Sequence, residues 1–286
     1  MTVSAVARPL FLSVIASLLS IPAFGQATAT PPKTAKPPKT ATPKTATPKT
    51  YEPQVGQGGK DVVWVPTPQA LVDKMLDMAK VTPADFVMDL GSGDGRTVIT
   101  AAKRGSRAVG IEYNPEMVEL SKKNAAAAGV ADKATFMKAD LFETDLSKAQ
   151  VITMFLLPQI NMKLRPTILN LKPGTRIVSN TFTMEDWVAD ETETVTDEDC
   201  TSWCTALLWI VPAKVQGSWE MPQGELKLLQ QFQVISGSLG SDPLTDAKLR
   251  GNEISFKVGT DTFSGTVDGN TIRGTGSRGA WTATRK

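Results

Sequence analysis

The sequence contains no histidine, and this absence removes several kinds of chemistry. Without imidazole there is no histidine general base, no serine–histidine or cysteine–histidine nucleophile pair, and no imidazole metal ligand. Only two cysteines are present, Cys200 and Cys204. Two thiolates without histidine do not complete a zinc site, so we predict no metal. The two cysteines lie four residues apart and either form a local disulfide or have no special role. We expect the disulfide if the chain is exported.

The main part of the chain also lacks an excess of basic residues. The formal net charge is +2, but residues 1–50 contain six of the 31 basic residues and none of the 29 acidic ones. The rest of the chain therefore carries 25 basic against 29 acidic residues. Nucleic-acid-binding domains normally present a basic patch, so we predict no nucleic-acid partner.

No apolar run is long enough for an ordinary membrane span. Residues 9–23 are almost wholly apolar, but about fifteen residues fall short of the roughly 20 that a transmembrane helix needs. Arg8 precedes this run, and the small residues Ala23 and Gly25 end it, as in a secretory leader. We therefore predict a signal peptide over residues 1–27 and export to the periplasm or the medium, with an uncleaved membrane anchor as the alternative.

Residues 28–50 are of low complexity and repeat the unit Pro-Lys-Thr-Ala. Such a composition cannot bury a core, so we predict a disordered linker that acts as a spacer. Its five lysines also suit an anionic surface, so transient membrane or cell-envelope contact through the linker or the C-terminal module is a second role that the composition allows.

Residues 51–215 alternate short apolar strands with amphipathic helices. One helix illustrates the pattern, because Asn114 is placed as its N-cap, Pro115 as its first residue and Gly129 at its end. Alternation of this kind predicts an α/β domain, with a mostly parallel sheet and helices on both faces.

The pattern changes near residue 216, after which no helical period is found. Residues 216–286 contain short alternating runs separated by turns, and the sequence VDGNT at 267–271 is a strong hairpin signal. We predict a small antiparallel all-β module, either a barrel or a sandwich, with Trp219, Phe256 and Trp281 in its core. The predicted domains are the signal peptide (1–27), the linker (28–50), the α/β domain (51–215) and the β module (216–286).

The sequence DFVMDLGSGDGR places a glycine-rich turn between a strand and a helix, an arrangement that binds nucleotides. A phosphate-binding loop relies on bare backbone amides, whereas Asp89 precedes this loop and Asp94 lies within it. Two carboxylates would repel a phosphate. They suit a ligand with a cationic group, hydroxyls and no phosphate, and S-adenosylmethionine is such a ligand.

Two further acids follow the next two strands. Glu112 ends the second strand, where a carboxylate can accept both hydroxyls of a ribose. Asp140 ends the third, where a carboxylate can accept the exocyclic amine of adenine. The alternatives are that the glycines serve only a tight turn, that Glu112 is a solvated strand end and that Asp140 caps a helix. The combined pattern favours S-adenosylmethionine as the cofactor.

The segments DLGSGDGR, GIEYNPEMVE and KADLF resemble the first three motifs of class I S-adenosylmethionine-dependent methyltransferases. The resemblance covers roughly residues 63–215. Within that class, WVPTP, TMFLLP and LRPTILNLKPGTRIVSNTF are similar to the small protein-lysine methyltransferases related to the ATP synthase c-subunit lysine methyltransferase. The resemblance implies a Rossmann-like seven-stranded sheet with a reversed last strand, and it implies that Thr67 and Pro68 lie over the cofactor.

The fourth motif position limits the acceptor. Methyltransferases of amide or base nitrogens usually carry Asn/Asp-Pro-Pro-aromatic there, but this chain has Phe155-Leu156-Leu157-Pro158. An apolar wall suits the aliphatic arm of a lysine, because desolvation lowers the pKa of its amine toward the neutral form that attacks a methyl group. We therefore predict acceptor contacts at Phe155, Leu156 and Pro158, and we assign no catalytic residue. The predicted cofactor-binding residues are Thr67, Asp89, Gly91, Ser92, Gly93, Glu112, Tyr113, Asp140 and Leu141.

Two functions remain open from the sequence. The first is a methyltransferase that acts on a protein lysine or a small amine, favoured by the intact Asp89, Gly91, Gly93 and Glu112. The second is a non-catalytic cell-envelope binding protein built on a methyltransferase-like fold. The leader favours the second, because S-adenosylmethionine is made in the cytosol.

Overall fold

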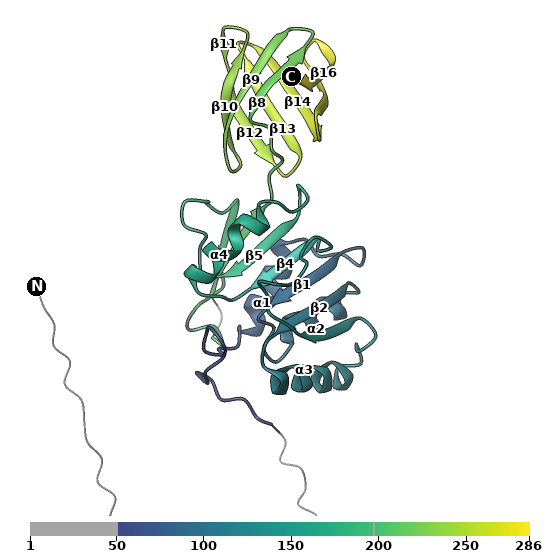
Figure 1. Ribbon diagram of the computed structural model, residues 1–286, viewed down its shortest axis with the longest axis vertical. Helices are drawn as coiled ribbons and strands as arrows, with labels where there is room; N and C mark the ends of the chain where they lie inside the picture. The colour runs from purple at the N-terminus through teal and green to yellow at the C-terminus, as the bar shows by residue number, and fades with distance from the viewer. Residues whose placement is uncertain (1–50, 197) are drawn as a thin grey trace, which may run out of the picture. The chain divides into compact units, whose positions relative to one another are not determined.

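The computed structural model describes residues 51–196 and 198–286 (Figure 1). The predicted signal peptide (1–27) and linker (28–50) lie outside the described residues. Two sheets organise the described chain, one of seven strands and one of nine. No helix in this part of the chain is long and apolar enough to cross a bilayer.

The first sheet is α/β, as predicted, and its strand order is β3-β2-β1-β4-β5-β7-β6. Strands β1 to β5 run parallel, and β7 is antiparallel to both β5 and β6. The implied seven-stranded Rossmann-like sheet with a reversed strand is therefore confirmed. Its elements are α1 (Gln69–Met78), β1 (Phe86–Leu90), α2 (Arg96–Lys103), β2 (Arg107–Glu112), α3 (Pro115–Ala127), β3 (Ala134–Lys138), β4 (Val151–Met154), α4 (Pro158–Ile168), β5 (Arg176–Asn180), β6 (Glu191–Thr194) and β7 (Thr205–Ile210).

Alternate residues of each strand supply the two faces of this sheet. In β1, Val87 belongs to one buried cluster, whereas Met88 and Leu90 belong to the other. The apolar faces of α1, α2 and α3 complete the first cluster, and α4 completes the second. The N-cap prediction is also confirmed, because Asn114 Oδ1 accepts the Glu116 N–H at 2.9 Å. This layering brings the carboxyl ends of β1 to β5 to one edge.

The second sheet is a closed antiparallel barrel, one of the two predicted forms. Strands β8 to β11 each pair with the next along the chain, as do β12 to β16; β16 pairs back with β8, and β10 lies against β12 (Figure 1). Trp219, Phe256 and Trp281 are buried inside it, as predicted. Its strands are β8 (Gly217–Met221), β9 (Gly224–Gln231), β10 (Val234–Leu239), β11 (Asp242–Pro243), β12 (Thr245–Arg250), β13 (Glu253–Val258), β14 (Asp261–Asp268), β15 (Thr271–Gly276) and β16 (Gly279–Arg285).

Three local features extend or correct the prediction. Residues 225–239, one of the alternating runs of the predicted β module, form a hairpin that turns at Phe232, whose φ is +54°. An acidic segment that carries no alternating apolar pattern contains the edge strand β6, in which three of the four side chains are exposed. The expected Cys200–Cys204 disulfide is present.

The β9–β10 turn contacts the core of the first sheet. Phe232 stacks on the buried Trp187 with 5.7 Å between ring centroids, and Trp187 donates its indole N–H to Gln233 Oε1 at 2.9 Å. The β9–β10 turn of the barrel therefore packs on part of the core of the first sheet. The boundary between residues 215 and 216 stays a prediction.

Candidate functional site

A pocket opens at the carboxyl edge of β1, β2, β3 and β4. The space between its walls, counted together with the solvent at its mouth, is about 1090 Å³. Residues 57–67, which precede α1, form one wall and are called the strap below. All nine predicted cofactor residues line this pocket, namely Thr67, Asp89, Gly91, Ser92, Gly93, Glu112, Tyr113, Asp140 and Leu141.

Two of the three predicted acceptor residues line the pocket. Phe155 and Leu156 line the pocket directly after β4. Pro158 is not part of the pocket lining. It is the first residue of α4, a position that suits proline because an N–H there would have no helical partner. An acceptor contact by Pro158 is therefore not supported by its position.

Glu112 joins the end of β2 to the glycine-rich loop. Its carboxylate accepts the Gly93 N–H at 3.0 Å through Oε2 and the Asn114 N–H at 2.9 Å through Oε1. A carboxylate oxygen has room for a second donor. Half-buried and held by two backbone groups, Glu112 can still accept hydroxyl donors from the pocket side.

Asp89 is buried at the end of β1 and accepts a hydrogen bond from the Thr153 hydroxyl at 2.7 Å. Burial raises the pKa of Asp89 to about 7, with repulsion from Asp94 and Glu112 adding to the shift and the hydroxyls of Thr153 and Thr97 opposing it. A cationic ligand beside this carboxyl would favour its ionised form.

This raised pKa predicts a pH-dependent stability. An unfolded aspartate has a pKa near 3.9, so between about pH 4 and pH 7 the folded cofactor-free protein holds a proton that the unfolded chain has lost. The contribution of Asp89 to the free energy of unfolding therefore falls as pH rises through this window. Each pKa unit of difference between the folded and unfolded states corresponds to about 1.4 kcal/mol. Urea unfolding across pH 4–8 should show the decline in the wild type and a smaller one in Asp89→Asn. The exposed Asp268→Asn serves as the control, and an unchanged slope in Asp89→Asn would contradict the assignment.

The sequence suggested that Asp94 faces the ligand, but its carboxylate is bound by a neighbouring arginine. The Arg96 guanidinium donates to both of its carboxylate oxygens and also to the Thr67 carbonyl oxygen at 3.0 Å. The charge of Asp94 is thus paired within the protein. Through Arg96, the glycine-rich loop is tied to the end of the strap.

The glycines of the loop are needed partly for contacts within the protein. A Cβ atom built at Gly93 would lie 2.5 Å from Nε1 of Trp64, the first residue of the WVPTP motif, to which the sequence pattern assigned no role. At Gly91, which is exposed, the nearest atom to such a Cβ is Leu156 Cδ2 at 3.2 Å. Gly93 therefore makes room for the strap, whereas Gly91 presents bare backbone to the pocket.

Asp140 is also paired within the protein, by Lys60 of the strap. The Lys60 ammonium holds the pKa of Asp140 below its usual range and lies 4.6 Å from the ring centroid of Tyr113. No sequence pattern points to Lys60, because it comes from an irregular segment 80 residues away. An adenine amine would have to share or displace this ion pair to reach Asp140.

The lining fits S-adenosylmethionine in its chemistry. The two basic side chains of the lining, Lys60 and Arg96, are paired with Asp140 and Asp94, which leaves the acids at the ends of β1 and β2 for the ligand. Such a set suits a cationic ligand with hydroxyls. Exposed backbone at Gly91 allows close approach of its main body.

Comparison with known proteins places this site in a family. The family model described as "ANTKMT methyltransferase domain" matches residues 89–191. A protein-lysine N-methyltransferase of Saccharolobus islandicus is 45% identical over 139 residues, which cover 48% of this chain and 86% of that protein. The mouse lysine N-methyltransferase of the ATP synthase c-subunit is 35% identical over 130 residues, covering 45% of this chain and 52% of that protein. The chain thus spans about half the length of this animal relative.

Solved structures include a similar protein from Salinibacter ruber, described as an RNA methyltransferase in complex with S-adenosyl-L-homocysteine. It is 46% identical, covers 53% of this chain and 96% of its own, and has a TM-score of 0.49. The match of the methyltransferase family model agrees with S-adenosylmethionine as the cofactor. The predicted resemblance is confirmed, and the chain belongs to the family of protein-lysine N-methyltransferases within the class I S-adenosylmethionine-dependent methyltransferases.

Proposed function

We propose that this enzyme transfers the methyl group of S-adenosylmethionine to the ε-amino group of a lysine in a protein. The observation that carries the proposal is the composition of the pocket. Acids lie at the ends of β1 and β2, whereas an apolar wall is formed at the end of β4 and directly after it by Met154, Phe155 and Leu156. The 45% identity to a protein-lysine N-methyltransferase supports the same acceptor.

One side of the pocket would bind the cofactor, and the other would receive the lysine amine. Glu112, Asp89 and the open backbone at Gly91 would hold the cofactor, which when bound supplies an electrophilic methyl carbon on a sulfonium. The wall of Phe155 and Leu156 desolvates the incoming amine and so lowers its pKa, which exposes the nitrogen lone pair. The bound cofactor would supply its methyl carbon to this nitrogen, and the carbon–sulfur electron pair would stay with sulfur. The proton lost from nitrogen passes to solvent.

The test is methyl transfer from labelled S-adenosylmethionine to proteins of the source cell, followed by acid hydrolysis. Label recovered in methyl-lysine is the expected result. Label recovered in RNA or in free small amines would overturn the protein-lysine assignment, and calorimetric binding without any transfer would revive the non-catalytic alternative. The comparisons give that alternative no support.

We further propose that the enzyme is exported, with envelope contact through the linker or the barrel. Two observations support this: the leader-like composition of residues 1–27 and the Cys200–Cys204 disulfide, a bond that persists in oxidising compartments. N-terminal sequencing of the native protein should give a start near Gln26 or Thr28 in an extracytoplasmic fraction. An intact Met1 in the cytosol would contradict export.

A further inference from the structure

Three aromatic side chains gather beside the apolar wall of the pocket. Phe155 stacks on Phe182, with 5.8 Å between ring centroids and 19° between planes. Trp203 packs against the same Phe155 at 6.1 Å and 57°. These three residues are called the aromatic cluster below. Since Phe155 lines the pocket, the cluster continues the pocket wall outward.

The reversed strand of the sheet explains why these residues meet. Phe155 follows the carboxyl end of β4, and Phe182 follows that of β5. Trp203 precedes the amino end of β7, and because β7 is antiparallel to β5, that end lies at the same sheet edge. The Thr181 N–H donates to the Thr205 carbonyl oxygen at 2.7 Å and fixes the two segments together.

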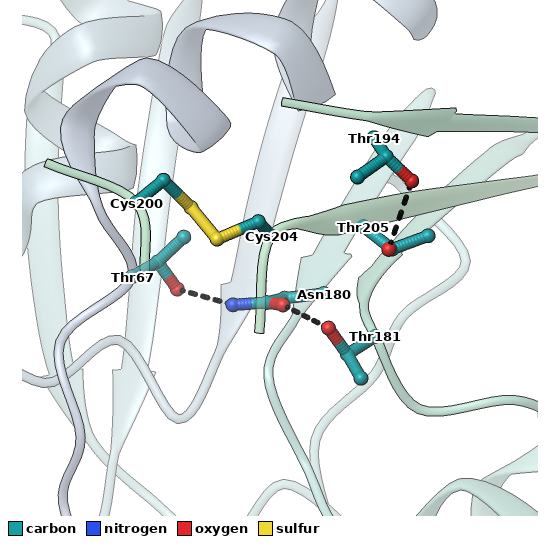
Figure 2. The surroundings of a disulfide bond; sticks show 7 residues. All are labelled: Thr67, Asn180, Thr181, Thr194, Cys200, Cys204 and Thr205. Atoms are coloured by element: carbon teal, nitrogen blue, oxygen red, sulfur yellow. Dashed lines mark hydrogen bonds between the residues drawn. A yellow bond between two sulfur atoms is a disulfide. The ribbon is translucent and has the colours of Figure 1, made fainter. Parts of the chain in front are cut away.

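Trp203 lies inside a loop that is closed by a covalent bond. The Cys200–Cys204 disulfide closes the short loop that contains it, and Trp203 has a φ of +55°, a left-handed conformation that non-glycine residues rarely adopt. Cys200 is buried in the core. Figure 2 shows the disulfide beside Thr67 of the pocket and its hydrogen-bond partner Asn180, the last residue of β5.

Trp203 is nevertheless 46% exposed, whereas Trp187, Trp209 and Trp219 are fully buried. The indole of Trp203 meets the pocket wall through Phe155 and leaves nearly half of its surface to solvent. It presents a flat apolar and π-electron surface, which attracts both an alkyl chain and an ammonium group.

We propose that the aromatic cluster is the entrance for the acceptor lysine, and that the Cys200–Cys204 disulfide holds Trp203 in its working position. The inference rests on the proposed function, since it names the groups that receive the lysine arm. Phe155 and Phe182 contact its methylenes, and Trp203 attracts its ammonium before the amine reaches the pocket. Methyl transfer then depends on the disulfide, although the cysteines touch no reacting atom.

The kinetic test uses poly-L-lysine as acceptor. Trp203→Ala should lower kcat/KM at least tenfold, mainly through KM, while the calorimetric Kd for S-adenosylmethionine stays within twofold. Trp203→Phe should stay within about threefold of the wild type. Leu229→Ala in the barrel removes an apolar side chain that is even more exposed than Trp203, and it should change neither constant. An unchanged KM in Trp203→Ala would overturn the entrance.

The disulfide is tested by a cycle of variants. Replacing both Cys200 and Cys204 by serine should reproduce the rise in KM seen in Trp203→Ala. Adding Trp203→Ala to that double variant should raise KM by less than a further twofold, because the indole has already lost its position. Independent, multiplying effects would show that the disulfide does not act through Trp203.

A binding measurement separates this inference from the proposed function. Nα-acetyl-lysine methylamide is titrated into the chain with S-adenosylhomocysteine present, and the six indole N–H signals are followed by NMR, with that of Trp203 assigned from Trp203→Phe. We expect the Trp203 signal to shift and that of the buried Trp219 to stay. A selective shift without methyl transfer would sink only the proposed function. Methyl transfer without a shift would sink only the entrance.

Discussion

Glu112→Ala is expected to lower the affinity for S-adenosylmethionine at least tenfold while the chain stays folded. The wild-type carboxylate, at the end of β2 in the pocket lining, is fixed by the N–H groups of Gly93 and Asn114. A hydrogen bond to a charged acceptor contributes about 1.5–3 kcal/mol, and a tenfold change in Kd corresponds to about 1.4 kcal/mol. Loss of even one such bond to the ligand therefore reaches the stated factor. Isothermal calorimetry on the purified variant measures it directly.

The matched control is Glu116→Ala, which removes an exposed acid from the first turn of α3, outside the pocket lining. Its Kd for S-adenosylmethionine should stay within twofold of the wild type. This control separates direct contact with the ligand from the loss of one negative charge on the protein. Circular dichroism and thermal unfolding confirm the fold of both variants. If Glu112→Ala is folded and binds as tightly as Glu116→Ala, the carboxylate only braces the loop.

Gly93→Ala is expected to abolish measurable cofactor binding and to lower the free energy of unfolding. Gly93 has a φ of +54°, and its new Cβ would lie 2.5 Å from the indole nitrogen of Trp64. A left-handed non-glycine residue costs on the order of 1–3 kcal/mol. The clash adds to this, because the Trp64 indole must move and carry the strap away from the pocket. Urea unfolding gives the loss of stability, and calorimetry gives the loss of binding.

Gly129→Ala separates the two causes. Its φ is +70°, but nothing lies within 4 Å of the position of its Cβ. It should therefore show the backbone cost alone and retain full cofactor affinity. The double variant Trp64→Ala, Gly93→Ala should regain stability relative to Gly93→Ala, because the clash is removed. Equal losses in Gly93→Ala and Gly129→Ala would show that Trp64 is irrelevant.

The amino-acid sequence by itself determined the order and type of most elements and the acids at the strand ends. Asn114 and Pro115 mark a helix start because capping and the fixed φ of proline act over a few residues. Glu112 and Asp140 were assignable because parallel strands expose their carboxyl ends at one edge, wherever the sheet lies. Local periodicity is enough for conclusions of this kind.

Local patterns are weaker guides where strands lie close together or at an edge. The hairpin at Phe232 falls inside one continuous alternating run, because a turn made by a non-glycine residue at positive φ leaves no compositional signal. Strand β6 is not predicted for another reason. As an edge strand with mostly exposed side chains, it carries no alternating apolar pattern.

Only the tertiary structure decided which distant side chains fill the space around the site. Trp64 packs over Gly93, Lys60 pairs with Asp140, and Trp203 packs against Phe155. Each contact joins residues far apart in the chain, in irregular or differently packed segments, and no periodic pattern encodes such a pairing. The reason is physical: hydrogen-bonded elements follow from short-range backbone geometry, whereas the neighbours of a side chain are fixed only when the whole sheet closes around its core.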